Sequence, residues 1–553
     1  MTEPKLPSET LILLVHDRDR RPVIPEPRSS EAAARQQVGA DRPSRGYLWD
    51  ERAGADELPR QRWGVIAPEG AAGDRLLAAI APLIARRREQ CGGEPIAPLR
   101  VPPDMDAAAA MKWYKRYFEP GSVFRDKIPR YVLILGDLDQ VSLELQQVVG
   151  ATAFVGRLAF ESADEYAAYA AKVLRAEDGP AATRPPRALL HAVEDGTTAT
   201  ESGRRVLCEP GAELLRGAGV EVGDLAREAT PEELRRAARG ETGGVLFTVS
   251  HGIGAPRGGW SSPAEQRRRQ GAMSLGERGD LAGDALRGGA FVPGGLWFMF
   301  ACFSAGTPAT SAYTPWLELL AAHAPGRIDP RVALASLPPA GSPPFVAALP
   351  KAALASTDGP LAFIGHVDLA WTYAFRETHE GVSRAHPARF MAVLRAARDG
   401  ARVGVAFREL YRYFEQTNTE LSTLDTSRLD AAAAQRRGAL WMLRQDLAGY
   451  VLLGDPAVRL AGLGDAAPRP ASAPAATTTA TPQARVDPRA FIPFASTAPA
   501  RARIDPAAVE RAAARVILGE DASAVAAQLG LDAKELARAI EAYRKAGRRA
   551  IDG

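Results

Sequence analysis

Short segments that are apolar at every position set the strongest constraint on the fold of this chain. The clearest runs from Tyr131 to Leu135 and is closed by Gly136-Asp137, and the segments 244–250 and 295–301 have the same character. A strand that is apolar throughout, rather than at every second residue, is buried on both of its faces. Helical patterns separate these strands, so the sequence predicts a mostly parallel β-sheet flanked by helices, an α/β/α architecture.

The composition is that of a globular protein with a sizeable core. The chain has 553 residues, of which 46% are hydrophobic and 24% charged, which is enough for several domain-sized units. The net charge of +3 argues against a dedicated binder of nucleic acids or membrane surfaces. No apolar run approaches the roughly 18 residues of a membrane span, and the N-terminus lacks a signal-peptide pattern, so we expect a cytoplasmic protein.

The cysteine pattern argues against a disulfide framework and against a cysteine-rich zinc site. The three cysteines, Cys91, Cys208 and Cys302, include no Cys-x-x-Cys pair, and their number is odd. We therefore expect no metal and no cofactor. Cys91 falls at a predicted helix end and Cys208 within a predicted helix, and structural roles are expected for both.

Two strand ends carry reactive side chains toward one edge of the predicted sheet. His251-Gly252 follows the strand that ends at Ser250, and Cys302 follows the strand that ends at Ala301. Because the carboxyl ends of parallel strands meet at one edge of a sheet, neighbouring strands would bring His251 and Cys302 together. An imidazole beside a thiol can take its proton and later protonate a leaving amine.

The residues around this pair suit acyl transfer. Gly252 lets a substrate backbone approach, and its N–H, with that of Cys302, can point at a developing oxyanion. Taken alone, a buried cysteine is usually a small hydrophobic residue, and a lone histidine is usually a hydrogen-bonded structural residue. Their matching strand-end positions, 51 residues apart, favour the functional interpretation.

The arrangement resembles the caspase-fold cysteine peptidases, most of all the bacterial CHAT and gingipain-like proteases. The resemblance rests on His251-Gly252 at one strand end and on the alanine-cysteine-x-serine segment 301–304 at the next. Three more stretches agree with it: Gly136-Asp137 with Val155-Gly156-Arg157, the segment 345–366, and the Leu-Gly-Asp-Pro of 453–456. The residues that flank Cys302 depart from the strict caspase pattern, so aspartate specificity is not implied.

The resemblance implies a caspase-like sheet and a cysteine endopeptidase that cleaves a protein partner through a thioester. Cys302 would be the nucleophile, His251 the general base and acid, and the backbone N–H groups of Gly252 and Cys302 the oxyanion hole. No side chain is assigned to orient the histidine. Asp280 and Asp284 are candidate pocket residues for a basic substrate side chain, although solvated loop carboxylates are the commoner case.

Two other polar groups leave alternatives open. Residues 267–269 are three consecutive arginines that could select an acidic substrate side chain, but a charge run is usually a solvated surface. His366 and Asp368 follow a further predicted strand and form either a second polar cluster at the sheet edge or a structural pair.

Composition and resemblance together divide the chain into four parts. Residues 1–124 are expected to be an α/β extension or a pseudo-caspase subdomain, and residues 125–462 a caspase-like catalytic domain. Residues 463–504, rich in Ala, Pro and Thr, are predicted to be a linker because they cannot bury enough apolar surface to order themselves. Residues 505–553 are predicted to form a small bundle of three helices.

The terminal bundle resembles the helix-turn-helix core of transposase-like modules. Its eight basic and eight acidic residues balance, whereas a DNA-binding domain is expected to be basic. We therefore expect residues 505–553 to bind an activating or recruiting protein rather than to bind nucleic acid strongly. By analogy at the level of the fold, such a protease would be regulated and would act in bacterial defence or cell death. The alternatives are a catalytically silent scaffold and a nucleic-acid-sensing regulator that acts through the bundle.

Overall fold

The computed structural model describes residues 53–463, apart from gaps at 94–95, 120–127, 182–184, 224–227, 257–258, 324–333, 335–336, 340, 380–381 and 425–430, together with two short strands near the N-terminus, β1 (Glu9–Thr10) and β2 (Arg28–Ser29). Most of the apolar segment 10–16, nearly all of the predicted linker 463–504 and the predicted bundle 505–553 lie outside the described residues. Within the described residues, no helix has the length and apolar character needed to cross a membrane.

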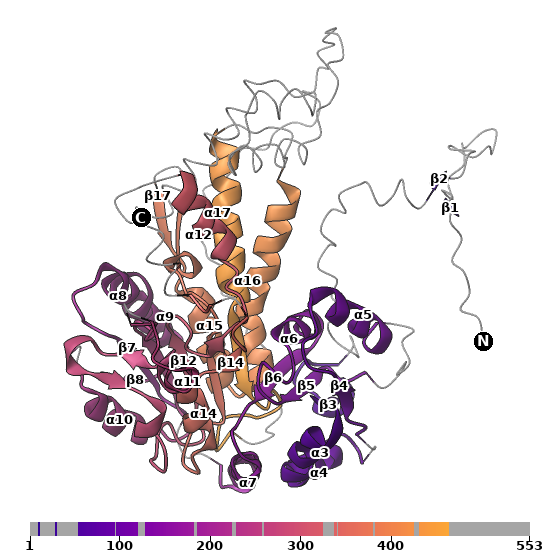
Figure 1. The fold of residues 1–553 in the computed structure, drawn as a ribbon. Coiled ribbons are helices and arrows are strands. Elements are labelled where there is room, and N and C mark those ends of the chain that lie inside the picture. The colour runs from indigo at the N-terminus through magenta and orange to yellow at the C-terminus, as the bar shows by residue number, and fades with distance from the viewer. Residues whose placement is uncertain are drawn as a thin grey trace, which may run out of the picture.

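A ten-stranded sheet runs through the molecule in the order β4-β3-β5-β6-β18-β15-β12-β9-β7-β8 (Figure 1). β18 (Tyr450–Gly454) is antiparallel to β15 (Ala362–His366), and every other neighbouring pair that shares two or more residue pairs is parallel. The mostly parallel α/β prediction is therefore confirmed. The other strands of the sheet are β3 (Trp63–Pro68), β4 (Leu99–Val101), β5 (Tyr131–Leu135), β6 (Phe154–Leu158), β7 (Ala188–Ala192), β8 (Val222–Gly223), β9 (Val245–Val249) and β12 (Leu296–Phe300).

Helices flank the sheet, and the long pair α16 and α17 extends away from it (Figure 1). The helices are α2 (Leu58–Gln61), α3 (Gly70–Ala79), α4 (Ala81–Gln90), α5 (Ala107–Tyr117), α6 (Leu143–Gly150), α7 (Ala163–Asp178), α8 (Thr198–Ser202), α9 (Glu209–Gly217), α10 (Pro231–Arg239), α11 (Pro263–Arg269), α12 (Thr314–His323), α14 (Ala348–Ala355), α15 (Ala388–Arg398), α16 (Val403–Thr423) and α17 (Ala431–Ala448). Short strand pairs lie outside the sheet: β10 (Met273–Ser274) with β11 (Asp280–Leu281), β13 (Gly306–Thr307) with β14 (Phe345–Val346), and β16 (Arg376–His379) with β17 (Val382–Ala385).

One predicted helix is divided in the structure. The sequence predicts a single helix over 71–88, whereas α3 ends at Ala79 and α4 begins at Ala81, with Ile80 between them. Pro82 lies in the first turn of α4, where its missing N–H and its ring interrupt the hydrogen-bond ladder of a continuous helix. The predicted start of α10 is confirmed, since Thr230 and Glu233 form a complete capping box.

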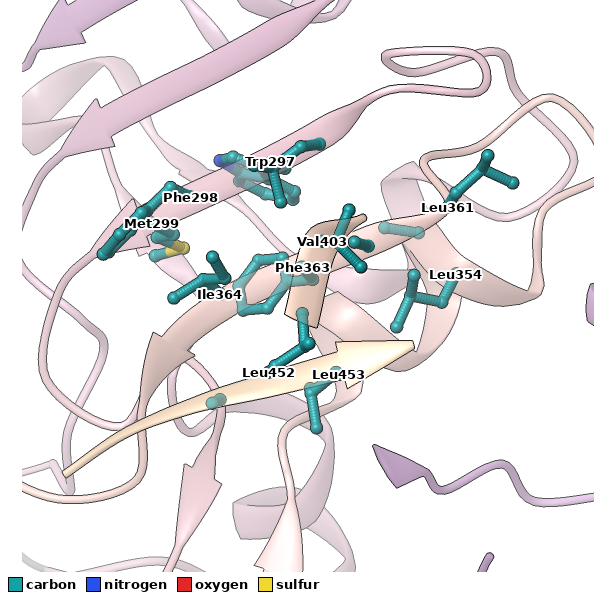
Figure 2. Packing of buried hydrophobic residues seen from close by; sticks show 14 of the residues in the cluster. Trp297, Phe298, Met299, Leu354, Leu361, Phe363, Ile364, Val403, Leu452 and Leu453 are labelled. Carbon is teal, nitrogen blue, oxygen red and sulfur yellow. The ribbon is translucent and has the colours of Figure 1, made fainter. Parts of the chain in front are cut away.

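The core lies where the central strands meet. Figure 2 shows Trp297, Phe298 and Met299 of β12 beside Phe363 and Ile364 of β15, all of them fully buried. Burying a side chain of this size stabilises the fold by about 1.5–3 kcal/mol. The carboxyl ends of β9 and β12, which carry the candidate residues, are thereby fixed on the best-packed part of the sheet.

The segments that carry the family resemblance, other than those of His251 and Cys302, hold the fold together. Arg157 of β6 is fully buried and donates hydrogen bonds to Gln146 Oε1 and to the carbonyl oxygens of Gly136, Asp137, Val141 and Ser142, at 2.7–3.3 Å. The carboxylate of Asp137 accepts the N–H of Val346 and an ion pair from Lys351, each at 2.6 Å. The loop after β5 is thus tied to β14 and α14.

A second buried joint lies at the end of β18. Asp455 accepts hydrogen bonds from Trp63 Nε1 at 2.9 Å and from Arg87 Nε at 2.8 Å, and both charged side chains are fully buried. Trp63 begins β3, which pairs with β5. Residues 63–101 therefore contain two strands, β3 and β4, that continue the sheet across the predicted boundary at residue 125.

Candidate active site

The register of β9 and β12 brings His251 and Cys302 to the same edge of the sheet. The two strands are parallel, with Val249 opposite Phe300, and each candidate residue follows its strand by two positions. The backbones touch beyond the strands, because a Cβ placed on Gly252 would lie 1.8 Å from the carbonyl oxygen of Cys302. No residue larger than glycine fits at position 252.

The His251 imidazole is held by the loop that follows β7. Its Nε2 lies 2.9 Å from Thr197 Oγ1 and 3.8 Å from Asp195 Oδ2. Thr197 Oγ1 also lies 2.8 Å from Asp195 Oδ1, and a carboxylate only accepts, so the single hydroxyl proton goes to Asp195 and the imidazole donates from Nε2. Nδ1 is then the unprotonated nitrogen that can act as a base.

Asp195 is an acidic partner that the sequence interpretation did not assign. Its side chain is only 6% exposed, whereas that of His251 is 46% exposed. Burial acts to raise the pKa of Asp195, but hydrogen bonds from Thr200 and Thr197 outweigh it and bring that pKa below its usual value. The sequence does hold a signal for this residue: Asp195 closely follows β7, the strand next to β9.

The Cys302 sulfur is bracketed by the backbone of a single residue, Ala370. Sγ accepts the N–H of Ala370 at 3.3 Å and lies 3.6 Å from the Ala370 carbonyl oxygen, to which the thiol can donate. Among the described residues, no hydrogen bond joins the imidazole of His251 to this sulfur. The pKa of Cys302 is raised to about 11, mainly by burial and also by the nearby carboxylates of Asp446 and Asp368, while the Ala370 N–H acts in the opposite direction. The thiol is therefore neutral in this structure.

Two backbone N–H groups, those of Gly252 and Cys302, donate no bond to a backbone carbonyl within the described chain. His251 and Ile253 bond to Ser274 and Ala272, so the N–H of Gly252 between them is turned away from β10. The N–H of Cys302 likewise donates no bond to another backbone group. Phe303, the next residue, has φ 55°, an uncommon backbone conformation for a bulky side chain that often marks a functional turn.

The candidate pocket residues Asp280 and Asp284 both pair with arginines of the chain itself. Asp280 lies in β11 and accepts Arg269 Nη2 at 2.7 Å, and Asp284 Oδ1 lies 3.6 Å from Arg287 Nε. Arg267, from the same arginine run, lies 3.4 Å from Asp139. A charged substrate side chain would have to displace one of these pairs.

A polar hollow lies beside the imidazole instead. Its volume is about 220 Å³, and it is lined by the loop after β7 and the first turns of the following helix: Val193, Glu194, Gly196, Thr197, Thr198, Thr200, Glu201 and Arg204. Thr197 contacts both the hollow and His251. Among the described residues, no group of three or more His, Cys, Asp or Glu side chains is arranged to hold a metal ion.

The thiol pKa gives a first prediction. With a pKa of about 11, the thiolate fraction of Cys302 in the unliganded protein is about 10⁻⁴ at pH 7. Because the thiolate is the reacting form, alkylation by iodoacetamide should be slow at neutral pH and rise about tenfold per pH unit until the pH approaches 11. Mass spectrometry of the Cys302 peptide measures this rate. A plateau below pH 8.5 would contradict the buried, neutral thiol.

The comparisons with known proteins reach only the level of the fold. No protein-family model and no curated protein sequence matches the chain. Similar solved structures include one described as a protease, with 13% identity and a TM-score of 0.41 over 72% of this chain and 78% of that chain. A complex of the pro- and mature domains of Porphyromonas gingivalis RgpB has 15% identity and a TM-score of 0.41, over 72% and 80% of the two chains. The arginine-specific cysteine proteinase gingipain R (RgpB) has 12% identity and a TM-score of 0.39, over 75% and 80%.

Proposed function

We propose that the protein is a cysteine endopeptidase in which Cys302 is the nucleophile and His251 is the general base and acid. One observation carries the proposal: the register of β9 and β12 puts the Gly252 backbone against that of Cys302, where neither N–H donates a bond to another backbone group within the described residues. The proposed substrate is a protein. As the sequence suggests, residues 505–553 would bind an activating or recruiting protein, and a role in defence or cell death would follow from that regulation.

The proposed reaction begins with the neutral thiol. As the scissile carbonyl binds, a rotation of the two side chains brings His251 Nδ1 to the sulfur and takes the proton while Sγ bonds to the carbonyl carbon. The electron pair of the C=O bond moves to oxygen, where the N–H groups of Gly252 and Cys302 stabilise the oxyanion. The intermediate collapses to a thioester when the C–N bond breaks and the imidazolium gives its proton to the leaving amine. Water, activated by His251, then hydrolyses the thioester and restores the thiol.

Asp195 supports this cycle through Thr197. The imidazole becomes a cation in each half-reaction, and a carboxylate at 3.8 Å stabilises that cation and holds the ring in one tautomer. Asp195→Asn is expected to lower kcat about 10- to 100-fold with little change in KM. Steady-state kinetics with the best peptide substrate measures both constants. Thr198→Ala, at the first position of the helix that follows this loop and with no hydrogen bond to the imidazole, is the matched control and should leave both constants within about twofold.

The test of the proposed function is covalent labelling with a peptide-like probe. A library of peptidyl acyloxymethyl ketones, which react with a thiol only when their peptide part binds, is incubated with the protein, and the labelled cysteine is mapped. The proposal expects a thioether at Cys302 alone, absent in His251→Ala. Cys91 and Cys208 are internal controls. Labelling that is equal at the three cysteines, or that persists in His251→Ala, would overturn it.

A catalytically silent scaffold is the second candidate. The bracketed, neutral sulfur and the imidazole bonded to Thr197 favour it, because neither side chain is in reacting position in the unliganded protein. It predicts that no probe in the library reacts with Cys302, even under conditions in which the protein binds its partners.

A further inference from the structure

Three buried ionisable residues that the proposed reaction does not use lie in or against the loop after β15. Residues 367–374, here called the strap, pass over Cys302, and Ala370 of the strap brackets its sulfur. Buried around the strap are His366, Asp368 and Asp446. Burying charged groups costs free energy unless their hydrogen bonds compensate. Apolar residues would fill this space at lower cost, so the cluster indicates a function beyond packing.

Asp446 of α17 anchors the far end of the strap. Its Oδ1 accepts the N–H of Trp371 at 3.0 Å and its Oδ2 accepts the N–H of Ala374 at 3.1 Å. The carboxylate is completely buried. Trp371 directly follows Ala370, so the position of the peptide group at the sulfur depends on this anchor.

Asp368 anchors the near end. Its carboxylate accepts the Ser311 hydroxyl and the N–H of Ala312, each at 2.8 Å, and its carbonyl oxygen accepts the N–H of Phe303 at 2.9 Å. Phe303 directly follows the nucleophile. The near end of the strap is thus bonded both to the turn after Cys302 and to the segment before α12.

His366 links the two anchors. Its Nδ1 accepts the N–H of Asp368 at 3.0 Å, so the ring proton lies on Nε2. Nε2 is 2.9 Å from the Asp446 carbonyl oxygen and 3.4 Å from its Oδ1. The imidazole therefore connects the backbone of Asp368, at the near end of the strap, to Asp446 of α17, which anchors the far end.

We propose that Asp446, together with His366 and Asp368, is a positioning residue that fixes the strap and, through Ala370, the sulfur of Cys302. The inference rests on the proposed function, since it assigns the cluster to the same reaction. None of the three side chains bonds to the sulfur itself. A fully bonded polar network of this kind makes a loop rigid, which a nucleophile needs when a displacement of 1 Å costs about 10²-fold in rate.

The test variant is Asp446→Asn, which keeps one acceptor but turns an NH₂ group toward one of the two strap N–H groups. The substitution removes a negative charge near the sulfur, and a looser strap lets water reach the sulfur. Both changes lower the pKa of Cys302. Together we expect them to outweigh the loss of the Ala370 N–H, which would raise that pKa. We expect alkylation of Cys302 by iodoacetamide at pH 8 to rise about tenfold or more. Peptidase kcat should fall about tenfold or more, with KM changed less than about threefold.

A rise in Cys302 alkylation together with a fall in kcat separates a positioning role from general destabilisation of the protein. Buried Cys208 reports global opening, and its alkylation should stay unchanged. Asp455→Asn is the matched control, because it removes a buried carboxylate at the opposite edge of the sheet, where Gly454 pairs with Ala362. The pH profile of Cys302 alkylation is measured as well. The ionisable groups whose titration could shape this profile are those near the sulfur: Asp368, Asp446, His366, Tyr313 and Tyr450.

Three results would overturn the proposal: unchanged alkylation of Cys302 in Asp446→Asn, an equal rise at Cys208, or an equal rise in Asp455→Asn. If Asp446→Asn does not fold, Ser311→Ala is used in its place, because it removes one hydrogen bond to Asp368. This variant should raise Cys302 alkylation about threefold. An unchanged alkylation rate would again overturn the proposal. Alkylation does not require turnover. A protein without peptidase activity would therefore refute the proposed function while the labelling data still test the strap.

Discussion

His251→Ala is expected to lower kcat/KM for a peptide substrate by about 10³-fold or more, and Cys302→Ala by a similar factor. Without the imidazole nothing removes the proton from a thiol whose pKa is about 11, and nothing protonates the leaving amine. The two residues act in one proton transfer, so the double variant should lose little more than either single variant.

Hydrolysis of a fluorogenic peptide, chosen from the labelling library, measures this loss. Cys91→Ser is the control, because Cys91 lies at the end of α4 with its sulfur against the Leu58 carbonyl oxygen, and full activity is expected. Activity that survives in His251→Ala at more than about a tenth of the wild-type level would assign the proton transfer to another group.

Arg157→Met is expected to lower the free energy of unfolding by about 4 kcal/mol. The guanidinium satisfies four carbonyl oxygens and Gln146 Oε1 inside the protein, and methionine fills its volume without donating a single bond. Burial lowers the pKa of Arg157 to about 10, which reflects how little water reaches the group. The acceptors around the loop after β5 would remain buried and unpaired, and the tie between Asp137 and α14 would loosen.

Urea unfolding followed by far-UV circular dichroism measures this difference. Arg175→Met, on the exposed side of α7 with one bond to the Thr357 carbonyl oxygen, is the matched control and should change stability by less than about 1 kcal/mol. A loss in Arg157→Met no larger than that of the control would mean that water replaces the guanidinium at little cost.

The strands and their order of appearance could be predicted because each is apolar throughout. Tyr131–Leu135, Val245–Val249 and Leu296–Phe300 all lie inside segments that the sequence predicts as strands. Parallel pairing then implies that His251 and Cys302 approach each other, and the register supports it. The sequence does not predict the division between α3 and α4, because the apolar pattern continues across Ile80. Pro82 nevertheless interrupts the helical hydrogen bonds there.

The rest of the site depends on contacts between segments far apart in the chain. Asp195 and His251 are 56 positions apart, and Ala370 and Cys302 are 68 apart, so no local pattern pairs them. The resemblance marked Arg157 and Asp455 without giving their roles, and the structure shows both as buried joints. His366 and Asp368 were noticed as a polar pair, but Asp446, which completes the cluster, lies within a long helix whose sequence gives no sign of it.

The place of β18 has a consequence for synthesis on the ribosome. It is the last strand of the sheet along the chain, yet it lies between β6 and β15 in the middle of it. Until residues 450–454 have left the exit tunnel, β6 and β15 each present an open edge, and neither can complete its hydrogen bonds. A nascent chain that already carries Cys302 therefore cannot complete its central layer, and we expect a chain truncated before residue 450 to be prone to aggregation.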